Sequence, residues 1–210
     1  VEKLESQLAA ALLQLSQEGS RLTQARKAAA ERLAALVAIE LSELAMQGSR
    51  FSVQVSELGE FEASGNDRIE FLLANAGSDP RPLAKGASGG ELSRIMLAIE
   101  LVLAGDRPMP TMIFDEVDAG VGGQAAVELG RRLRRLSEKT QVIVVTHLPQ
   151  VAAFANHQIK VAKEISGEIT KSSVNILESQ DRKRELARML SGNPDSEVAL
   201  QHAEELLNSH

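Results

Sequence analysis

The chain has 210 residues and a formal net charge of −6 at pH 7. Its length allows one large or two modest domains, and its acidic balance gives no electrostatic signature of a nucleic-acid-binding surface. It has no cysteine, tryptophan or tyrosine, which excludes disulfides and thiolate-bound zinc and argues against aromatic stacking of bases. No apolar run approaches the ~20 residues of a membrane helix. A reducing cytosol suits this composition. Because the first residue is Val1 rather than methionine, we expect a piece of a longer polypeptide.

Residues 1–46 have the pattern of one long helix. They contain no proline and one glycine, Gly19, and apolar residues recur in steps of three and four, interrupted by Glu18 and Arg32. This is a heptad pattern, and such a helix would be about 70 Å long. We therefore predict one arm of an antiparallel coiled coil over residues 1–47, with its partner arm upstream. The alternative is a surface helix of a bundle. The apolar members of the seam are Val1, Leu4, Leu8, Ala11, Leu15, Leu22, Ala25, Ala29, Leu36 and Ile39.

Residues 48–210 are predicted to form an α/β region. Residues 50–55 and 68–72 alternate apolar and polar side chains, as half-buried strands do, around a turn predicted at residues 65–67. A proline-containing loop should follow over residues 75–86. A helix is then predicted over residues 88–104. Its predicted apolar face consists of Leu92, Ile95, Met96, Ile99 and Val102.

Two apolar runs in the middle of this region predict a parallel sheet. Residues 112–114 and 142–145 are continuously apolar, and a helical stretch over residues 124–139 separates them. Strand, helix and strand in this order are typical of a buried parallel unit. We therefore expect a mostly parallel sheet with flanking helices. Further strands are predicted at residues 158–163 and 170–176, and helices at residues 181–190 and 196–207.

The start of the helix at residue 88 has two interpretations. Ser88 followed by Glu91 matches a capping box, which satisfies the free N–H groups of a helix N-terminus. The intervening Gly89 and Gly90 also match a site where backbone amides approach a phosphate. The motif alone favours capping.

Polar residues follow both apolar strands. Asp115 and Glu116 come directly after the first strand, and two adjacent carboxylates there would be costly without a cation or hydrogen-bond partners. A magnesium ion would stabilise them, and one carboxylate could then activate water. The alternative is a charge pair at a helix N-terminus. His147 follows the second strand at the same sheet edge, where it could contact a phosphate or orient water. We assign no role to the other histidines, which are His157, His202 and His210.

In this order, the motifs resemble the ABC-type ATPase heads of the SMC-like family. ASGGELSR resembles the ABC signature, TMIFDEVDAGVGG resembles Walker B running into the D-loop, and VIVVTHLPQVA resembles the histidine switch. Segments such as DRIEF and ELARML resemble a bacterial branch of the family that acts in DNA double-strand-break repair and recombination. The resemblance covers essentially the whole chain. It implies the C-terminal lobe of an ABC ATPase head, over residues 48–210, preceded by a coiled-coil arm.

The resemblance implies ATP and Mg²⁺ as cofactors. Glu116 would be the general base, Asp115 would support Mg²⁺ through water, and His147 would sense the γ-phosphate. The alternative function is a nucleotide-gated structural clamp with little turnover, although a pure clamp does not need a general base. A transporter ATPase is disfavoured, because a heptad arm precedes the signature where transporters have a compact helical subdomain.

The resemblance also implies partners. Ser88, Gly89 and Gly90 would contact ATP bound to a second head of a homodimer, and Asp118 would lie in the D-loop at that interface. The sequence contains no G-x-x-x-x-G-K-[ST] motif, so the P-loop would come from the N-terminal half of the same polypeptide. This chain alone should be inactive. The resemblance implies a bacterial protein that is cytoplasmic and associated with the nucleoid. The complete protein would contact DNA, and no membrane partner is expected.

A cluster of four arginines suggests a second interpretation for one helix. Such a cluster could contact DNA, but these residues spread over more than one helix face in an acidic chain. We therefore favour a solvated helix face. The cluster consists of Arg131, Arg132, Arg134 and Arg135.

Overall fold

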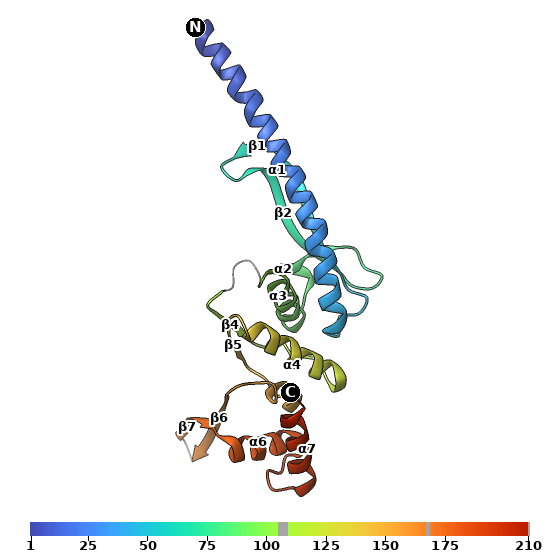
Figure 1. Ribbon diagram of the computed structural model, residues 1–210, viewed down its shortest axis with the longest axis vertical. Coiled ribbons are helices and arrows are strands. Elements are labelled where there is room, and N and C mark those ends of the chain that lie inside the picture. Colours follow the sequence, from blue (N-terminus) through green and yellow to red (C-terminus); the bar gives the residue numbers. More distant parts are fainter. Residues whose placement is uncertain (105–108, 167–168, 210) are drawn as a thin grey trace. The chain divides into compact units, whose positions relative to one another are not determined.

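The computed structural model describes residues 1–104, 109–166 and 169–209. The chain forms two compact units, one of Val1–Ser42 with Met46–Ser88 and one of Glu43–Ala45 with Gly89–His210. Figure 1 labels the elements. In chain order they are α1 (Glu2–Glu43), β1 (Arg50–Glu62), β2 (Gly65–Ala74), β3 (Arg81–Pro82), α2 (Leu83–Gly86), α3 (Gly89–Leu103), β4 (Thr111–Phe114), α4 (Gly123–Ser137), β5 (Gln141–Val144), α5 (Pro149–Ala152), β6 (Gln158–Ser166), β7 (Ile169–Leu177), α6 (Ser179–Ser191) and α7 (Glu197–Asn208).

The predicted order of the longer elements is confirmed. The elements that the sequence did not predict are β3, α2 and α5, which have two to four residues each and are too short for a periodic pattern. The turn predicted at residues 65–67 is wrong, because Gly65 already begins β2 and the turn is formed by residues 63 and 64. Antiparallel pairing of β1 and β2 runs from Arg50 opposite Ala74 to a final pair of Glu62 and Gly65.

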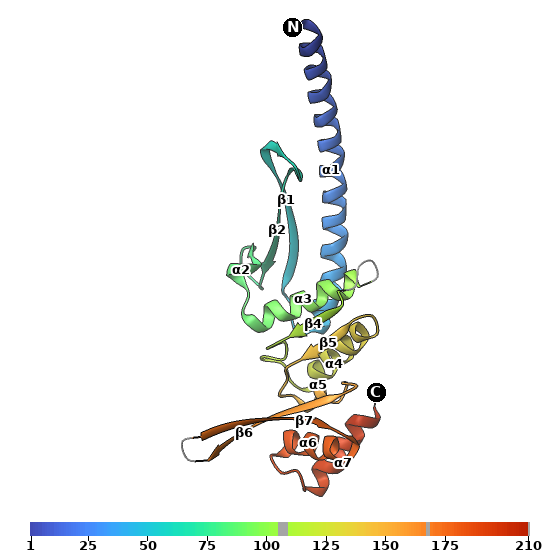
Figure 2. The ribbon, with the colours of Figure 1, turned by 90° about the vertical axis from the view of Figure 1, so that its left-hand side faces the viewer.

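The hairpin β1–β2 packs along α1 in the first unit, as both ribbon views show (Figures 1 and 2). The ring of Phe61 lies against Gly19, where a Cβ atom would come within 2.3 Å of the ring. Asp67 accepts hydrogen bonds from Thr23 at 2.7 Å and from Arg26 at 2.9 Å. The single glycine of the helix and three polar side chains therefore fix the hairpin on α1.

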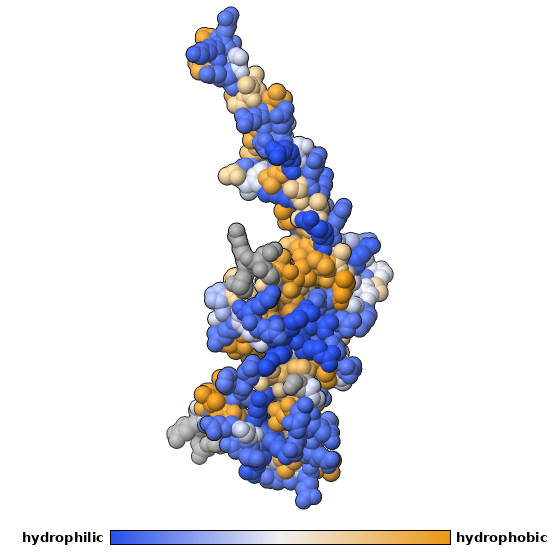
Figure 3. All heavy atoms as spheres, in the orientation of Figure 1, coloured by the Kyte–Doolittle hydropathy of each residue, from blue (hydrophilic) through white to orange (hydrophobic). Residues whose placement is uncertain are grey.

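The heptad seam of α1 does not include the buried residues of this helix, although its Leu22 lies close to Gly65 of the hairpin. The buried residues of α1 are Ala30, Val37 and Leu41, and none of them belongs to the seam. All apolar seam residues are exposed, seven of them large, and apolar surface along α1 is visible in Figure 3. The seven large ones are Val1, Leu4, Leu8, Leu15, Leu22, Leu36 and Ile39. The helix is confirmed, while its pairing in a coiled coil stays a prediction.

The second unit contains the predicted parallel strands. β4 pairs with β5 in parallel, from Thr111 opposite Gln141 to Phe114 opposite Val144, and α4 connects them. Parallel pairing is confirmed for β4 and β5, whereas β1–β2–β3 and β6–β7 are antiparallel, so the described sheets are mixed rather than mostly parallel. The two parallel strands are also less buried than their continuous apolar runs predicted, since Ile113 is 70% exposed.

Helices α5, α6 and α7 enclose a small alanine- and leucine-rich core at the end of the second unit. Its buried residues are Ala152, Ala153, Leu186, Ala187, Ala199 and Ala203. β6 and β7 form an antiparallel hairpin from Gln158 opposite Leu177. No helix within residues 1–104, 109–166 and 169–209 is both long and apolar enough to cross a membrane.

Candidate functional site

The carboxyl ends of β4 and β5 bring the predicted polar residues to one sheet edge. Phe114 and Val144 are paired at the ends of these strands, and the N–H of Val145 donates to the carbonyl of Phe114 at 3.0 Å. Asp115 and Glu116 follow β4 directly, while His147 follows β5. The structure therefore confirms that parallel pairing places the two segments side by side.

Asp118 connects these two segments. Its Oδ2 atom accepts a hydrogen bond from Thr146 Oγ1 at 2.5 Å and one from the backbone N–H of His147 at 3.1 Å. The same oxygen lies 3.1 Å from His147 Nδ1. Asp118 is 3% exposed, whereas the His147 side chain is 73% exposed. Asp118 thus orients an exposed imidazole, and Thr146 is a site residue that sequence reasoning missed.

The adjacent carboxylates of Asp115 and Glu116 are both exposed. The N–H of Glu116 donates to Asp115 Oδ1 at 2.9 Å, and Glu116 has a left-handed φ of 56°. This conformation costs a non-glycine residue about 1 kcal/mol, so surrounding contacts must hold it. It turns the chain sharply after β4.

The two glycines at the start of α3 pack under this turn. A Cβ atom on Gly89 would lie 2.6 Å from Glu116 Oε2. A Cβ atom on Gly90 would lie 2.9 Å from Ala119 Cβ and 3.0 Å from the Glu116 carbonyl oxygen. The glycine pair therefore permits close approach of Glu116 to the first turn of α3. Ser88 immediately precedes α3, as the last residue of the first unit, and its capping box with Glu91 stays a prediction.

Two further residues of α3 hold the chain after β4. Ser93 Oγ donates to the carbonyl of Asp115 at 2.8 Å, and Arg94 donates to the carbonyls of Ala119 at 2.8 Å and Val117 at 3.4 Å. Burial lowers the pKa of the Arg94 guanidinium. The predicted apolar face of α3 is partly wrong as a result. Arg94 is on the buried side with Ile95 and Ile99, whereas Leu92 and Met96 are exposed.

The donor set at the end of β4 fits magnesium. Carboxylate oxygens are hard ligands, and Mg²⁺ is usually held by one or two carboxylates together with water and phosphate oxygens. Among the described residues, no group of three or more His, Asp or Glu side chains could hold a metal ion. Asp115 could therefore hold Mg²⁺ only with water or phosphate as the other ligands, which is the coordination that this ion prefers.

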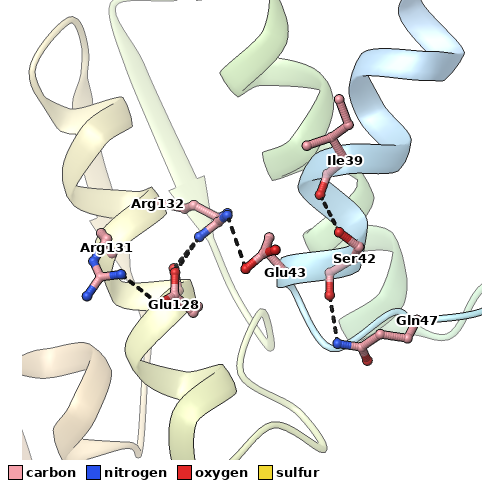
Figure 4. A network of polar contacts seen from close by, with 7 residues as sticks. All are labelled: Ile39, Ser42, Glu43, Gln47, Glu128, Arg131 and Arg132. Carbon is pink, nitrogen blue, oxygen red and sulfur yellow. Dashed lines mark hydrogen bonds and ion pairs between the residues drawn. The ribbon is translucent and has the colours of Figure 1, made fainter.

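The arginine cluster on α4 makes contacts within its own unit (Figure 4). Arg131 pairs with Glu128 at 2.6 Å, and Arg132 pairs with Glu128 at 2.7 Å and lies 3.8 Å from Glu43. Arg134 donates to the carbonyl of Phe154 at 3.3 Å. These contacts favour a structural role over DNA contact for this helix. No hydrogen bond or ion pair described for the site involves His157 or His202, to which we assigned no role. His210 lies outside the described residues.

The chain is similar to proteins of one family. The family described as "RecF/RecN/SMC N terminal domain" matches residues 12–170. The chain is 55% identical to the DNA repair protein RecN of Streptomyces coelicolor over 201 residues, which are 90% of this chain and 35% of that protein. It is 42% identical to RecN of Haemophilus influenzae over 209 residues, 99% of this chain and 38% of that protein. The chain thus spans little more than a third of these relatives.

Solved structures with a similar fold are SMC heads. The Smc head domain with a coiled coil and joint from Pyrococcus yayanosii has a TM-score of 0.61 and 20% identity, covering 97% of this chain and 34% of that chain. The Smc head domain with an extended coiled coil from Pyrococcus furiosus, which is bound to the C-terminal domain of ScpA, has a TM-score of 0.55 and 19% identity, covering 83% of this chain and 42% of that chain. At these identities the similarity establishes the fold, a mixed α/β head.

Proposed function

Since the chain belongs to the RecF/RecN/SMC N-terminal domain family, we propose that it is the C-terminal part of an SMC-like ABC ATPase head. The complete protein would bind and hydrolyse ATP between two heads during DNA double-strand-break repair and recombination. One observation carries this proposal. The Glu116 carboxylate lies at the carboxyl end of a parallel strand, packs against Gly89 of α3, and is followed by Asp118, which orients His147.

The chain's own residues would divide the chemistry. Glu116 would accept a proton from the attacking water, because its carboxylate is exposed and held in one backbone conformation. Asp115 would hold Mg²⁺, which when bound neutralises phosphate charge. His147, oriented by Asp118, would donate to the γ-phosphate.

The helix start would serve a second head. Ser88, Gly89 and Gly90 precede or begin α3, where N–H groups and the helix dipole favour a phosphate. We propose that this phosphate belongs to ATP on the facing head, with Asp118 in the loop at that interface. We propose that the chain has two parts, a coiled-coil arm over residues 1–47 and a head lobe over residues 48–210.

Exposed apolar faces support a larger head. The parallel strands expose Ile113 and Ile143, Val145 directly after β5 is also exposed, and Ile159, Val161, Val174 and Ile176 are exposed on β6 and β7. A cluster of exposed apolar side chains on a sheet face is typical of an interaction site. We propose that the P-loop lobe from the N-terminal half of the same polypeptide covers the parallel strands, and that the second arm covers the seam of α1.

The second candidate function is a nucleotide-gated clamp that dimerises with little turnover. The exposed Glu116 carboxylate favours hydrolysis, because a clamp needs no general base. We further propose a cytoplasmic protein associated with the nucleoid, from the named role of its relatives in DNA repair. The 210-residue chain alone should not hydrolyse ATP, because it lacks the P-loop motif. Robust Glu116-dependent turnover by this chain would overturn the proposal.

The test of the two-headed site is a mixing experiment with the complete polypeptide. Ser88→Arg puts a bulky cation where the facing head's phosphate would dock, and loss of a cap costs only about 1 kcal/mol. This variant should bind ATP but not dimerise or hydrolyse it. When it is mixed with a P-loop lysine variant, one intact composite site is restored in each mixed dimer, and partial ATP hydrolysis should return. If heads exchange and no hydrolysis returns, Ser88 does not act on a second head's nucleotide.

A further inference from the structure

Arg94 is a buried cation whose side-chain hydrogen bonds, among the described residues, go to main-chain carbonyls, while Glu91 is the carboxylate that acts on it electrostatically. It is 7% exposed, and its guanidinium donates to the main-chain carbonyls of Val117 and Ala119. Its Nε atom is buried without a hydrogen-bond partner among the described residues. Burying a charge in this way is costly. An apolar side chain would fill an inward position of α3 at lower cost, so the guanidinium must serve another purpose there.

The purpose that the geometry indicates is to fix a loop by its backbone. Both hydrogen bonds come from Nη1 of Arg94, whose two N–H groups are fixed in the plane of the guanidinium, so one nitrogen reaches two carbonyls. The neighbouring Ser93 donates to the carbonyl of Asp115. Three alternate carbonyls, those of Asp115, Val117 and Ala119, are therefore held by two adjacent residues of α3. Glu116 lies between the first two, in its left-handed conformation.

The other side of the same loop holds the segment after β5. The Asp118 side chain accepts hydrogen bonds from Thr146 and from the N–H of His147, and it lies beside His147 Nδ1. The Thr146 hydroxyl in turn accepts from the N–H of Leu148 at 3.0 Å. The loop is thus held by α3 on one side and holds the histidine segment on the other.

We propose that Arg94 is a positioning residue: it fixes the loop after β4 to α3, so that the position of α3 sets the positions of Glu116 and, through Asp118, of His147. The consequence for turnover rests on the proposed function, because it requires Glu116 and His147 to act on ATP. The attachment of the loop to α3 by Arg94 does not rest on the proposed function. An ATPase assay and a measurement of loop protection therefore test the two separately.

The experiment compares Arg94→Lys with Arg182→Lys in the complete polypeptide. Lysine keeps the charge and removes the planar guanidinium with its fixed N–H directions. Arg182 is the matched control, because it donates to the carbonyls of Ala152, Ala153 and Ala155 and burial also lowers its pKa. Amide hydrogen exchange is followed over residues 115–121 and 145–148, and ATP turnover and KM are measured in parallel.

Arg94→Lys should accelerate exchange over both segments, and kcat should fall at least about tenfold with KM within about twofold, because a small displacement of the base is costly. Arg182→Lys should accelerate exchange at residues 152–155 and leave kcat within about twofold of the wild type. Ser93→Ala, which removes one of the three bonds, should have an intermediate effect and covers the case in which Arg94→Lys does not fold. Unchanged exchange at residues 115–121, or equal losses of kcat in the two lysine variants, would overturn the inference. A wild type without turnover would instead contradict the proposed function. The exchange data would still show whether Arg94 holds the loop on α3.

Discussion

Two contacts in this chain resemble one another, one in each compact unit. In the first, the hairpin β1–β2 lies on α1, and in the second, the loop after β4 lies on α3. Each contact has a glycine at the point of closest approach. Gly19 faces the ring of Phe61, and Gly90 faces Ala119 and a main-chain carbonyl. A Cβ atom at either glycine would come within 3.0 Å of its neighbour. Glycine thus permits both contacts.

The two contacts differ in how they use charge. In the first unit, Arg26 pairs with the Asp67 carboxylate, whose side chain is fully buried. In the second, Arg94 holds carbonyls, and the carboxylate of Glu116 remains exposed. Hydrogen bonds, chiefly from Thr23, hold the pKa of Asp67 below its usual value of 3.8. Asp67, which fixes structure, is buried with its partners, whereas the loop after β4 is fixed through its backbone and leaves the carboxylates of Asp115 and Glu116 exposed.

The largest effect is expected for the two exposed carboxylates of the second contact, Asp115 and Glu116, whose substitutions should have different consequences. In the complete polypeptide, Glu116→Gln should lower ATP turnover at least about a hundredfold, because an amide cannot accept the proton of water. ATP binding and the thermal unfolding midpoint should be unchanged, and ATP-bound dimers should accumulate. Asp115→Asn should instead weaken Mg²⁺-dependent ATP binding. Calorimetry and steady-state turnover measure both effects, and identical behaviour of the two variants would contradict the division of roles.

The residues that sequence reasoning found differ from those that it missed in the kind of contact they make. Asp115, Glu116 and His147 follow apolar strands directly, and parallel pairing brings such positions to one edge. Arg94 binds loop carbonyls, and Thr146 binds the buried Asp118 carboxylate. The sequence pattern does not predict these contacts, because the partner atoms are brought into place only when the loop folds. The same holds for Asp67, whose partner Thr23 is 44 residues away.

The second prediction concerns the glycine of α3. Gly90→Ala should lower turnover about tenfold or more, because its Cβ would meet the Glu116 carbonyl oxygen and displace the base. Gly122→Ala is the control, since nothing lies within 4 Å of a Cβ atom there and its φ is not in the left-handed region. Steady-state turnover should separate the two variants. Equal activity would mean that the loop accommodates the methyl group without moving Glu116.

The third prediction concerns the buried carboxylate of the first contact. Asp67→Asn should lower the thermal unfolding midpoint, because Thr23 and Arg26 lose an ionised acceptor, while turnover per folded protein changes little. Since the pKa of Asp67 is lowered on folding, its stabilisation is present above about pH 4 and is lost as the pH falls through the folded pKa. The difference between variant and wild type should therefore shrink below pH 4. The control is Asp195→Asn, whose exposed pair with Arg184 should contribute little at any pH.

The smallest effect is expected at the glycine of α1. Gly19→Ala in an exposed helix normally stabilises by about 1 kcal/mol, but here the new Cβ would come within 2.3 Å of the Phe61 ring. Because that ring is the end of a flexible and 42% exposed side chain, it can move, and its displacement should offset the gain in helix propensity. Gly19→Ala alone should therefore leave the unfolding midpoint nearly unchanged, while in a Phe61→Ala background it should raise the midpoint. Urea unfolding of the four chains gives the coupling. Equal stabilisation in both backgrounds would show that Phe61 does not press on α1 and that the hydrogen bonds to Asp67 hold the hairpin there.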